Sequence, residues 1–206
     1  MIPKIVHTAL MGGYRPDALG ERCMESWRRV LPDYEIRVWT DENTPRSPFC
    51  DAAIASRPVN ASHYAQYRAL LDNGGVFLDC DVEVVRPFDL KPEVFCGFQR
   101  SETIDCCVNN AVVGAMPGHP FIRRVLERIE ASDPATWPLI SGPGAITDTL
   151  VELGMNAPGE EREIAGVMVY DKERFYPWSW EQPAIPVEQL SERTFACHWW
   201  AGSWKP

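Results

Sequence analysis

The sequence predicts an α/β fold, because short apolar runs alternate with amphipathic segments along the chain. The first apolar run, residues 2–10, is a predicted buried strand that ends in the flexible pair Gly12-Gly13. In residues 16–31, apolar side chains recur at steps of four, four and three, which is the spacing of a helix that buries one face. Pro32 ends this helix. Strand and helix in this order indicate a sheet covered by helices.

The next elements follow from the same signals. Residues 34–39 alternate polar and apolar side chains, which predicts a half-buried strand. A polar, proline-bearing loop is expected from Thr40 to about Pro48. Residues 61–73 place their apolar side chains on one side of a helix. The Asn-Gly-Gly sequence at residues 73–75 ends that helix, because glycine accepts the left-handed conformation of a helix C-terminus.

The rest of the chain up to about residue 170 continues the alternation. We expect strands at residues 76–78, 82–85, 94–98, 111–115 and 167–170, and helices at residues 120–131 and 144–153. From residue 176 onward the chain is rich in proline and tryptophan and shows no period. Internal repeats and a linker are absent from the sequence, so a single domain over residues 1–206 is predicted.

Composition excludes several classes of protein. Hydrophobic residues make up 45% of the chain and charged residues 24%, which excludes intrinsic disorder and is enough for a sizeable core. Acidic residues outnumber basic ones by 29 to 20, and the net charge of −9 argues against nucleic-acid binding. An anionic substrate would therefore need a local device such as a metal ion to hold it.

Cysteine usage and hydropathy indicate the compartment. The seven cysteines include no Cys-x-x-Cys pair, which favours free thiols in a cytoplasmic protein. The N-terminal residues 1–7 contain a proline, a lysine and a histidine, and so do not form a signal-peptide core. No apolar run approaches the roughly 18 residues that span a bilayer. We expect no transmembrane segment, and peripheral membrane association stays open.

A pair of carboxylates follows the predicted strand at residues 76–78. In an extended chain, Asp79 and Asp81 would face the same side, about 6–7 Å apart along the backbone. Placing two carboxylates at the end of an apolar strand costs free energy unless a positive charge neutralises them. Mg²⁺ or Mn²⁺ does this, because these ions prefer oxygen ligands and keep positions open for substrate phosphates.

Other interpretations of the pair remain open from the residues alone. The two aspartates could form a solvated turn without function. They could be the acid and nucleophile of a retaining glycosidase, although that role needs groups about 5 Å apart across a sugar, which same-facing neighbours fit poorly. A metal-dependent hydrolase could also use them.

The surrounding residues carry a resemblance to a known family. The stretch from Ser62 to Val82, with its Gly-Gly-Val-Phe-Leu-Asp-Cys-Asp-Val ending, resembles the core of the DXD-containing sugar transferases of glycosyltransferase family 32. That family includes capsular-polysaccharide transferases and yeast mannosyltransferases, and the catalytic domains of clostridial glucosylating toxins are related to it. Further matching segments are residues 2–7, Gly12-Gly13, the Cys-x-x-Ser-Trp sequence at 23–27, residues 109–111, residues 118–121 and residues 198–204.

The resemblance implies a GT-A fold, in which helices flank a mixed central sheet. It implies transfer of a sugar, with retention at the anomeric carbon, from a UDP- or GDP-linked donor. The acceptor would be a glycan or glycoconjugate, for example in surface polysaccharide synthesis. Mn²⁺ or Mg²⁺ would be the cofactor, since a divalent cation stabilises the charge that develops on a leaving diphosphate.

The same resemblance assigns roles to particular residues. Asp79 and Asp81 would be the catalytic pair: Asp81 would bind the metal, and Asp79 would contact the ribose or reach the metal through water. A late histidine, His198, would be the third metal ligand. Residues expected to bind the nucleotide cofactor are His7 near the base, Ser62 near the ribose, and Ser203 and Trp204 near the phosphates. Gly142 would lie beside the active site.

Two positions depart from the family pattern. His63 stands where the family usually has aspartate, and Gln66 stands where it usually has arginine. In the family these positions approach the donor sugar, so both residues are candidate substrate contacts. Their replacement leaves a second hypothesis open: a non-catalytic relative that binds a nucleotide sugar or a glycan.

Overall fold

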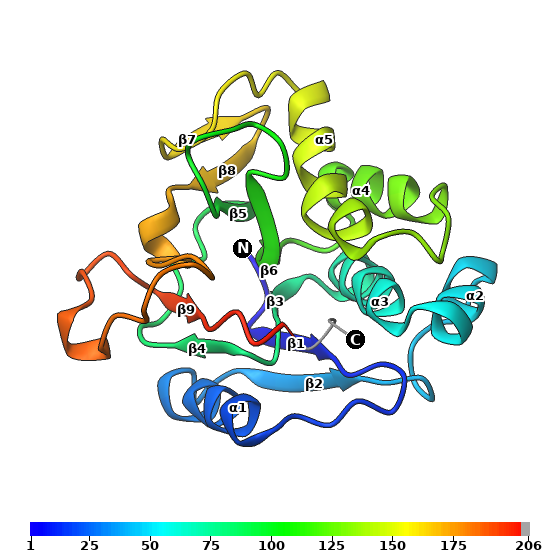
Figure 1. Cartoon of the computed structure of the whole chain (residues 1–206), viewed down its shortest axis with the longest axis horizontal. Coiled ribbons are helices and arrows are strands. Elements are labelled where there is room, and N and C mark those ends of the chain that lie inside the picture. Colours follow the sequence, from blue (N-terminus) through cyan, green and yellow to red (C-terminus); the bar gives the residue numbers. More distant parts are fainter. Residues whose placement is uncertain (203–206) are drawn as a thin grey trace.

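Seven strands form the central sheet of the computed structural model, which describes residues 1–202 (Figure 1). They are β1 (Ile5–Ala9), β2 (Glu35–Trp39), β3 (Gly75–Leu78), β5 (Val94–Phe98), β6 (Val108–Ala115), β7 (Arg162–Ile164) and β8 (Val167–Tyr170). Their order across the sheet is β2-β1-β3-β6-β5-β8-β7. β1 is parallel to β2 and β3, β6 is antiparallel to β3 and β5, β8 is parallel to β5, and β7 is antiparallel to β8. The predicted mixed sheet is confirmed.

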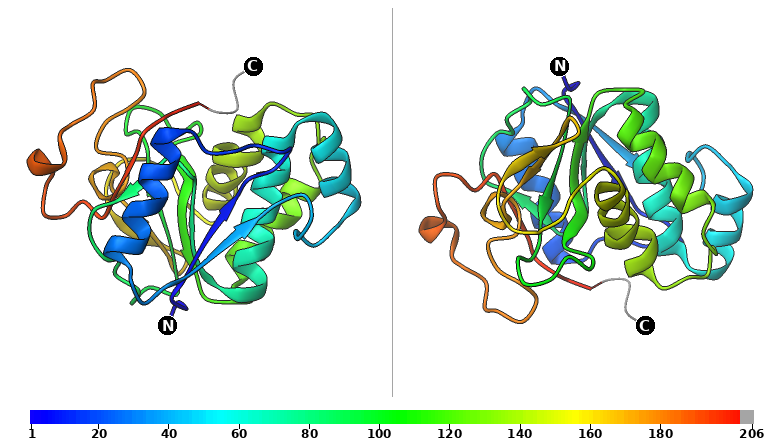
Figure 2. Two further views of the ribbon diagram at one scale, coloured as in Figure 1. Left: turned by 90° about the horizontal axis from the view of Figure 1, so that it is seen from below. Right: turned by 90° about the horizontal axis from the view of Figure 1, so that it is seen from above.

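Helices cover the sheet, and a small second sheet lies on one side of it. The α-helices are α1 (Ala18–Val30), α2 (Pro48–Ser56), α3 (Pro58–Asn73), α4 (Pro120–Glu130) and α5 (Ala145–Glu152). Shorter turns are the π-helical η1 (Ile140–Gly144) and the 3₁₀ turns η2 (Lys172–Arg174) and η3 (Val187–Gln189). Antiparallel strands β4 (Val82–Val84) and β9 (Ala196–His198) form the small sheet. Helices α2 to α5 lie on one face of the central sheet, and α1 lies on the other (Figure 2).

Strand β3 supplies side chains to both cores. Val76 and Leu78 pack in the core that contains Trp27 of α1, whereas Phe77 packs in the core that contains Tyr67 of α3. Successive side chains of a strand point to opposite faces, so one short apolar run joins the two layers. All four residues of β3 are buried, as an apolar run covered on both faces requires.

Most predicted elements are present, whereas helix α2 and strands β7 and β9 were not predicted. Helix α2 has no apolar stripe along one face, so periodicity does not reveal it. Its start follows local chemistry instead: the Ser47 side chain accepts a hydrogen bond from the Cys50 amide, and Pro48 occupies the first helical position. Strands β7 and β9 have three residues each, which is too short for a period to be recognised.

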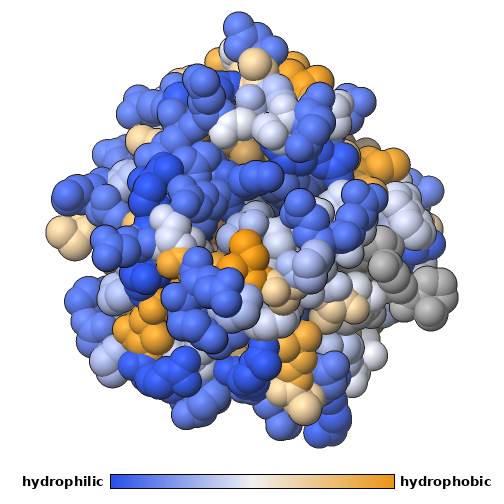
Figure 3. Space-filling model, turned by 60° about the vertical axis from the view of Figure 1, so that its left-hand side comes forward, coloured by the Kyte–Doolittle hydropathy of each residue, from blue (hydrophilic) through white to orange (hydrophobic). Residues whose placement is uncertain are grey.

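Two features are relevant to contact with a membrane: the apolar character of the helices and the hydropathy of the surface. None of the helices within residues 1–202 combines the length and the apolar character that crossing a bilayer requires. The face shown in Figure 3 is mainly hydrophilic, and its hydrophobic residues occur in small separate groups.

Candidate functional site

Asp79 and Asp81 meet through a turn rather than along a strand. The Val82 amide donates to the Asp79 carbonyl at 3.0 Å, and β4 begins at Val82. The Asp79 amide donates to the Ala111 carbonyl of β6 at 2.9 Å, which ties the turn to the central sheet. The prediction of one extended segment was therefore wrong in its geometry, because the chain turns here to leave the central sheet for the small one.

His198 joins the two aspartates because β9 pairs with β4. Val82 lies opposite His198 in this pairing, although the two residues are more than a hundred positions apart. The His198 Nε2 atom lies 3.3 Å from the Asp81 Oδ1 atom. One potential ligand atom from each of Asp79, Asp81 and His198 lies within 4.8 Å of the others. The three residues predicted as metal ligands are thus brought together, and we call them the DDH cluster.

Electrostatics in the DDH cluster favour a bound cation. Burial and, after it, the neighbouring Asp81 carboxylate together raise the pKa of Asp79 to about 6. Burial also disfavours charge on Asp81, but the His198 imidazole and the hydrogen bonds from backbone amides, including that of Ala201, together hold the pKa of Asp81 below its ordinary value. Burial opposes protonation of His198, yet the nearby aspartates raise its pKa. Two carboxylates in a desolvated position gain most from a positive charge beside them.

The donor set of the DDH cluster fits a divalent metal. Within residues 1–202, no group donates a hydrogen bond to the Asp79 carboxylate, and the His198 Nδ1 atom is buried without a partner. Carboxylate oxygens with one imidazole suit Mn²⁺ well and Mg²⁺ acceptably. Buried polar atoms without protein partners are expected where a ligand completes the site.

The segment after His198 is shaped around Asp81. Trp200 adopts a φ of 56°, a left-handed conformation that is strained for a tryptophan. This bend lets the Ala201 amide donate to Asp81 Oδ2 at 2.8 Å. The Trp200 ring lies 4.2 Å from the His198 ring. The strained backbone at Trp200 therefore lies where the chain contacts two of the candidate metal ligands, Asp81 and His198.

Helix α1 holds β4, and with it the turn that carries the aspartates. The buried Trp27 indole N–H donates to the Val82 carbonyl at 2.7 Å, and the Ser26 hydroxyl accepts from the Val84 amide at 2.9 Å. Sequence reasoning placed Trp27 in an apolar stripe but missed these contacts. The stripe predicts which face is buried, whereas the partner of the indole depends on tertiary packing.

The structure does not support the predicted contact of His7 with the nucleotide base. His7 is fully buried in the middle of β1. Its Nδ1 accepts from the Trp39 indole N–H at 3.0 Å, and its Nε2 therefore donates to the Gly74 carbonyl at 2.8 Å. Burial lowers the pKa of His7 to about 4, which keeps the ring neutral. The side chain links β1, β2 and the start of β3.

His63, Gln66 and Gly142 lie together, within a polar network that joins α3 to η1 and β6. His63 Nδ1 lies 2.8 Å from the Ser141 hydroxyl, and burial lowers the pKa of His63 to about 4. Gln66 is fully buried and exchanges two hydrogen bonds with Asn110, at 2.6 and 3.0 Å. A Cβ at Gly142 would lie 2.8 Å from the His63 ring, so only glycine fits. Gln66 is therefore a network residue rather than an open contact, which corrects its expected role.

Of the three remaining predicted nucleotide contacts, the structure describes only Ser62. Ser62 is partly buried on α3, and its hydroxyl lies 3.5 Å from the Pro58 carbonyl one turn earlier. Ser203 and Trp204 lie outside the described residues.

Replacing Asp79 by asparagine should stabilise the metal-free protein, increasingly so as pH rises. The folded pKa of about 6 exceeds the unfolded value of 3.8, so the folded state binds the proton more strongly between these values. The stability of the metal-free wild type should thus fall, relative to the variant, as pH rises through this range. The difference should approach about 3 kcal/mol above pH 6.

Urea unfolding in EDTA, at several values from about pH 4 to about pH 7, measures this difference. The comparison between variant and wild type cancels the opposite pH dependence of His7 and His63, whose folded pKa values lie near 4. A difference that does not change with pH would contradict the placement of Asp79 in a desolvated, like-charged pair.

A known family matches the part of the chain that contains the two aspartates. Residues 18–95 match the family described as the glycosyltransferase sugar-binding region containing the DXD motif. This segment is therefore similar to the DXD-containing region of glycosyltransferases. It includes Asp79 and Asp81, whereas His198 lies beyond it.

Curated relatives of the DXD region include yeast mannosyltransferases. A mannosyl phosphorylinositol ceramide synthase of Saccharomyces cerevisiae is 30% identical over 143 residues, which cover 65% of this chain and 36% of that protein. Inositol phosphoceramide mannosyltransferase 3 of Schizosaccharomyces pombe is 28% identical over 138 residues, which cover 62% and 37%. The chain thus spans less than half the length of these relatives.

Solved structures show the fold around the DXD region. The PaToxG glycosyltransferase superimposes with a TM-score of 0.52 at 15% identity, over 73% of this chain and 69% of that one. A glycosyltransferase involved in the glycosylation of the major capsid of PBCV-1 also gives 0.52, at 14% identity, over 95% and 93%. The GT-A fold that the sequence resemblance implied is confirmed.

Proposed function

We propose that this protein is a metal-dependent, retaining glycosyltransferase. It would transfer a sugar from a UDP- or GDP-linked donor to a glycan or glycoconjugate acceptor, as in the synthesis of a surface polysaccharide. The observation that carries the proposal is the DDH cluster, which the turn after β3 and strand β9 form beside the central sheet.

The DDH cluster would hold Mn²⁺ or Mg²⁺. The ion supplies Lewis-acid stabilisation of the negative charge that develops on the leaving diphosphate. Asp81 is oriented for this role by the Ala201 amide, and His198 by its place opposite Val82. A bound metal would also explain how a chain of net charge −9 could hold an anionic donor.

An exposed tryptophan near the DDH cluster would bind a sugar ring of the acceptor. Trp180 is 51% exposed, and its ring lies 5.5 Å from that of Trp200, which in turn packs on His198. The Arg100 guanidinium lies 5.1 Å from the centre of the Trp180 ring and adds a cation–π contact. An aromatic face that is held in place and open to solvent can stack on the apolar face of a sugar ring.

Metal removal tests the function directly. Sugar transfer or donor hydrolysis should be measured across UDP- and GDP-linked donors, with EDTA and then with Mn²⁺ restored. We expect EDTA to reduce turnover by at least about a hundredfold and Mn²⁺ to restore it. Full activity in EDTA would overturn the metal mechanism.

A second candidate is a non-catalytic nucleotide-sugar-binding relative, and the polar network favours it. Gln66 stands where the family has an arginine, and both ends of its side-chain amide are bonded to Asn110 rather than facing an open site. Calorimetry with Mn²⁺ and each donor would distinguish the candidates. Binding without hydrolysis or transfer across the whole panel supports this second function.

A further inference from the structure

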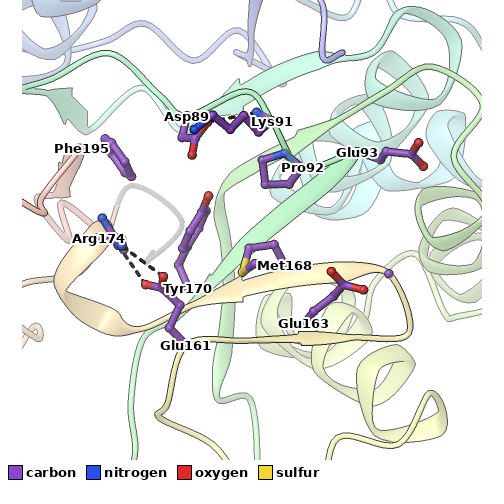
Figure 4. Close-up of a pocket in the computed structure, with 11 residues that line it drawn as sticks. Asp89, Lys91, Pro92, Glu93, Glu161, Glu163, Met168, Tyr170, Arg174 and Phe195 are labelled. Atoms are coloured by element: carbon purple, nitrogen blue, oxygen red, sulfur yellow. Dashed lines mark hydrogen bonds and ion pairs between the residues drawn. The ribbon is translucent and has the colours of Figure 1, made fainter.

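A cavity of about 590 Å³ lies beside β8, and none of its lining residues belongs to the DDH cluster (Figure 4). Its lining includes Glu93, which precedes β5, and Gly166, which precedes β8. The lining continues along β8 to Tyr170, the last residue of that strand. The cavity and the DDH cluster are therefore separate sites that share no residue. The volume lies within the range of small-molecule sites.

Tyr170 is the central feature of this cavity. The residue is only 6% exposed, and its ring packs edge-on against Phe175 at 5.6 Å and against Phe195 at 6.3 Å. Its hydroxyl points into the cavity, toward the segment that contains Asp89 and Lys91 (Figure 4). Within residues 1–202 this hydroxyl has no hydrogen-bond partner. A buried phenol that is held rigidly and lacks a partner is expected to bond a ligand or water.

Charged groups of both signs surround the Tyr170 hydroxyl. Arg174 forms two hydrogen bonds to Glu161, at 2.9 and 3.1 Å, and its guanidinium lies 5.4 Å from the Tyr170 ring centre. Within the described residues, Lys91 and Glu163 form no ion pair, so their polar atoms remain available. Asp89 and Glu93 add two more carboxylates to the lining.

The lining excludes several kinds of ligand. Four carboxylates repel a polyanion such as a nucleotide, whereas Lys91 and Arg174 oppose a compact multivalent cation. Within residues 1–202, the DDH cluster is the only group of three metal-ligating side chains close enough to share an ion, so this cavity offers no metal site. What fits is a neutral molecule with many hydroxyl groups and an apolar face. Met168 and Phe195 provide the apolar contact.

We propose that this cavity is a second, non-catalytic binding site for a neutral oligosaccharide. The Tyr170 hydroxyl and the carboxylates would bond sugar hydroxyls, and Lys91 would donate to their oxygens. Met168 and Phe195 would contact the apolar face of one sugar ring. This site goes beyond the proposed transfer reaction and does not depend on the DDH cluster.

Titration of ¹⁵N-labelled protein with neutral trisaccharides tests the site. The probes are mannotriose, maltotriose and chitotriose, with spermidine and inorganic phosphate as charged comparisons. At least one trisaccharide should shift the amide signals of Gly166, Met168 and Tyr170 at millimolar concentration. Tyr170→Phe should weaken that binding about three- to tenfold, since it removes one hydrogen bond. Tyr34→Phe, a partly buried tyrosine just before β2, is the matched control and should leave binding unchanged.

Asp81→Asn separates this proposal from the proposed function. The variant should bind the trisaccharide as the wild type does, even if donor turnover is lost or was never present. The proposal is overturned if no trisaccharide shifts these signals, if the shifts cluster only around Asp79 and Asp81, or if spermidine or phosphate binds there instead. Equal affinity of Tyr170→Phe and wild type would also overturn the role of the hydroxyl.

Discussion

Replacing Asp81 by asparagine is expected to lower sugar transfer by about a thousandfold while leaving the chain folded. The amide removes the negative charge that faces His198 Nε2 at 3.3 Å and would bind the metal. Its oxygen can still accept the hydrogen bond from the Ala201 amide, so the local backbone should persist. Initial rates against Mn²⁺ concentration, together with calorimetric titration of Mn²⁺, measure the effect.

The control for this experiment is Glu127→Gln, which removes an exposed carboxylate on α4. It changes the net charge by the same amount and should leave both rate and metal affinity unchanged. If Asp81→Asn retained the wild-type Mn²⁺ affinity and rate, the DDH cluster would not be the metal site.

Replacing Trp27 by alanine is expected to lower the free energy of unfolding by about 4 kcal/mol. Trp27 is fully buried, and its removal leaves a large cavity between α1 and the sheet. The change also leaves the Val82 carbonyl without its hydrogen bond from the indole. Urea unfolding monitored by circular dichroism measures the change.

Trp27→Phe separates the hydrogen bond from the packing. This variant keeps most of the apolar volume and should cost about 1–2 kcal/mol, mainly because a buried carbonyl loses its donor. Since Val82 follows Asp81 directly, Trp27→Phe should also weaken Mn²⁺ binding. Trp180→Phe, at an exposed indole, should leave stability unchanged. A loss of stability in Trp180→Phe as large as that in Trp27→Phe would contradict the assigned role of the Val82 contact.

Elements with a strong local signal were predicted well. Strand β5 has the predicted bounds of residues 94–98, because an uninterrupted apolar run is buried on both faces. Helix α4 begins at Pro120 as expected, and its buried side chains form the predicted stripe. Helix α2 was missed because its apolar residues do not gather on one face.

A family motif indicated the candidate site residues, but it did not indicate what each side chain contacts. His7 matched the family pattern, yet its two ring nitrogens are bonded to Trp39 and Gly74, which are remote in sequence. Gln66 likewise turns inward to Asn110. No local pattern shows which side of a strand or helix will meet such a partner, because tertiary packing decides it.

By itself, the sequence determined the fold class and the DXD motif at Asp79 and Asp81. Its net charge of −9 also argues against nucleic acid as a partner. Only the tertiary structure decided that a turn brings the aspartates together, that β9 carries His198 to them, and that Tyr170 faces a separate cavity. The physical reason is how far apart in the sequence the interacting residues lie. Periodicity and capping report how neighbouring residues are buried, whereas the pairing of β4 with β9 depends on packing between residues more than a hundred positions apart.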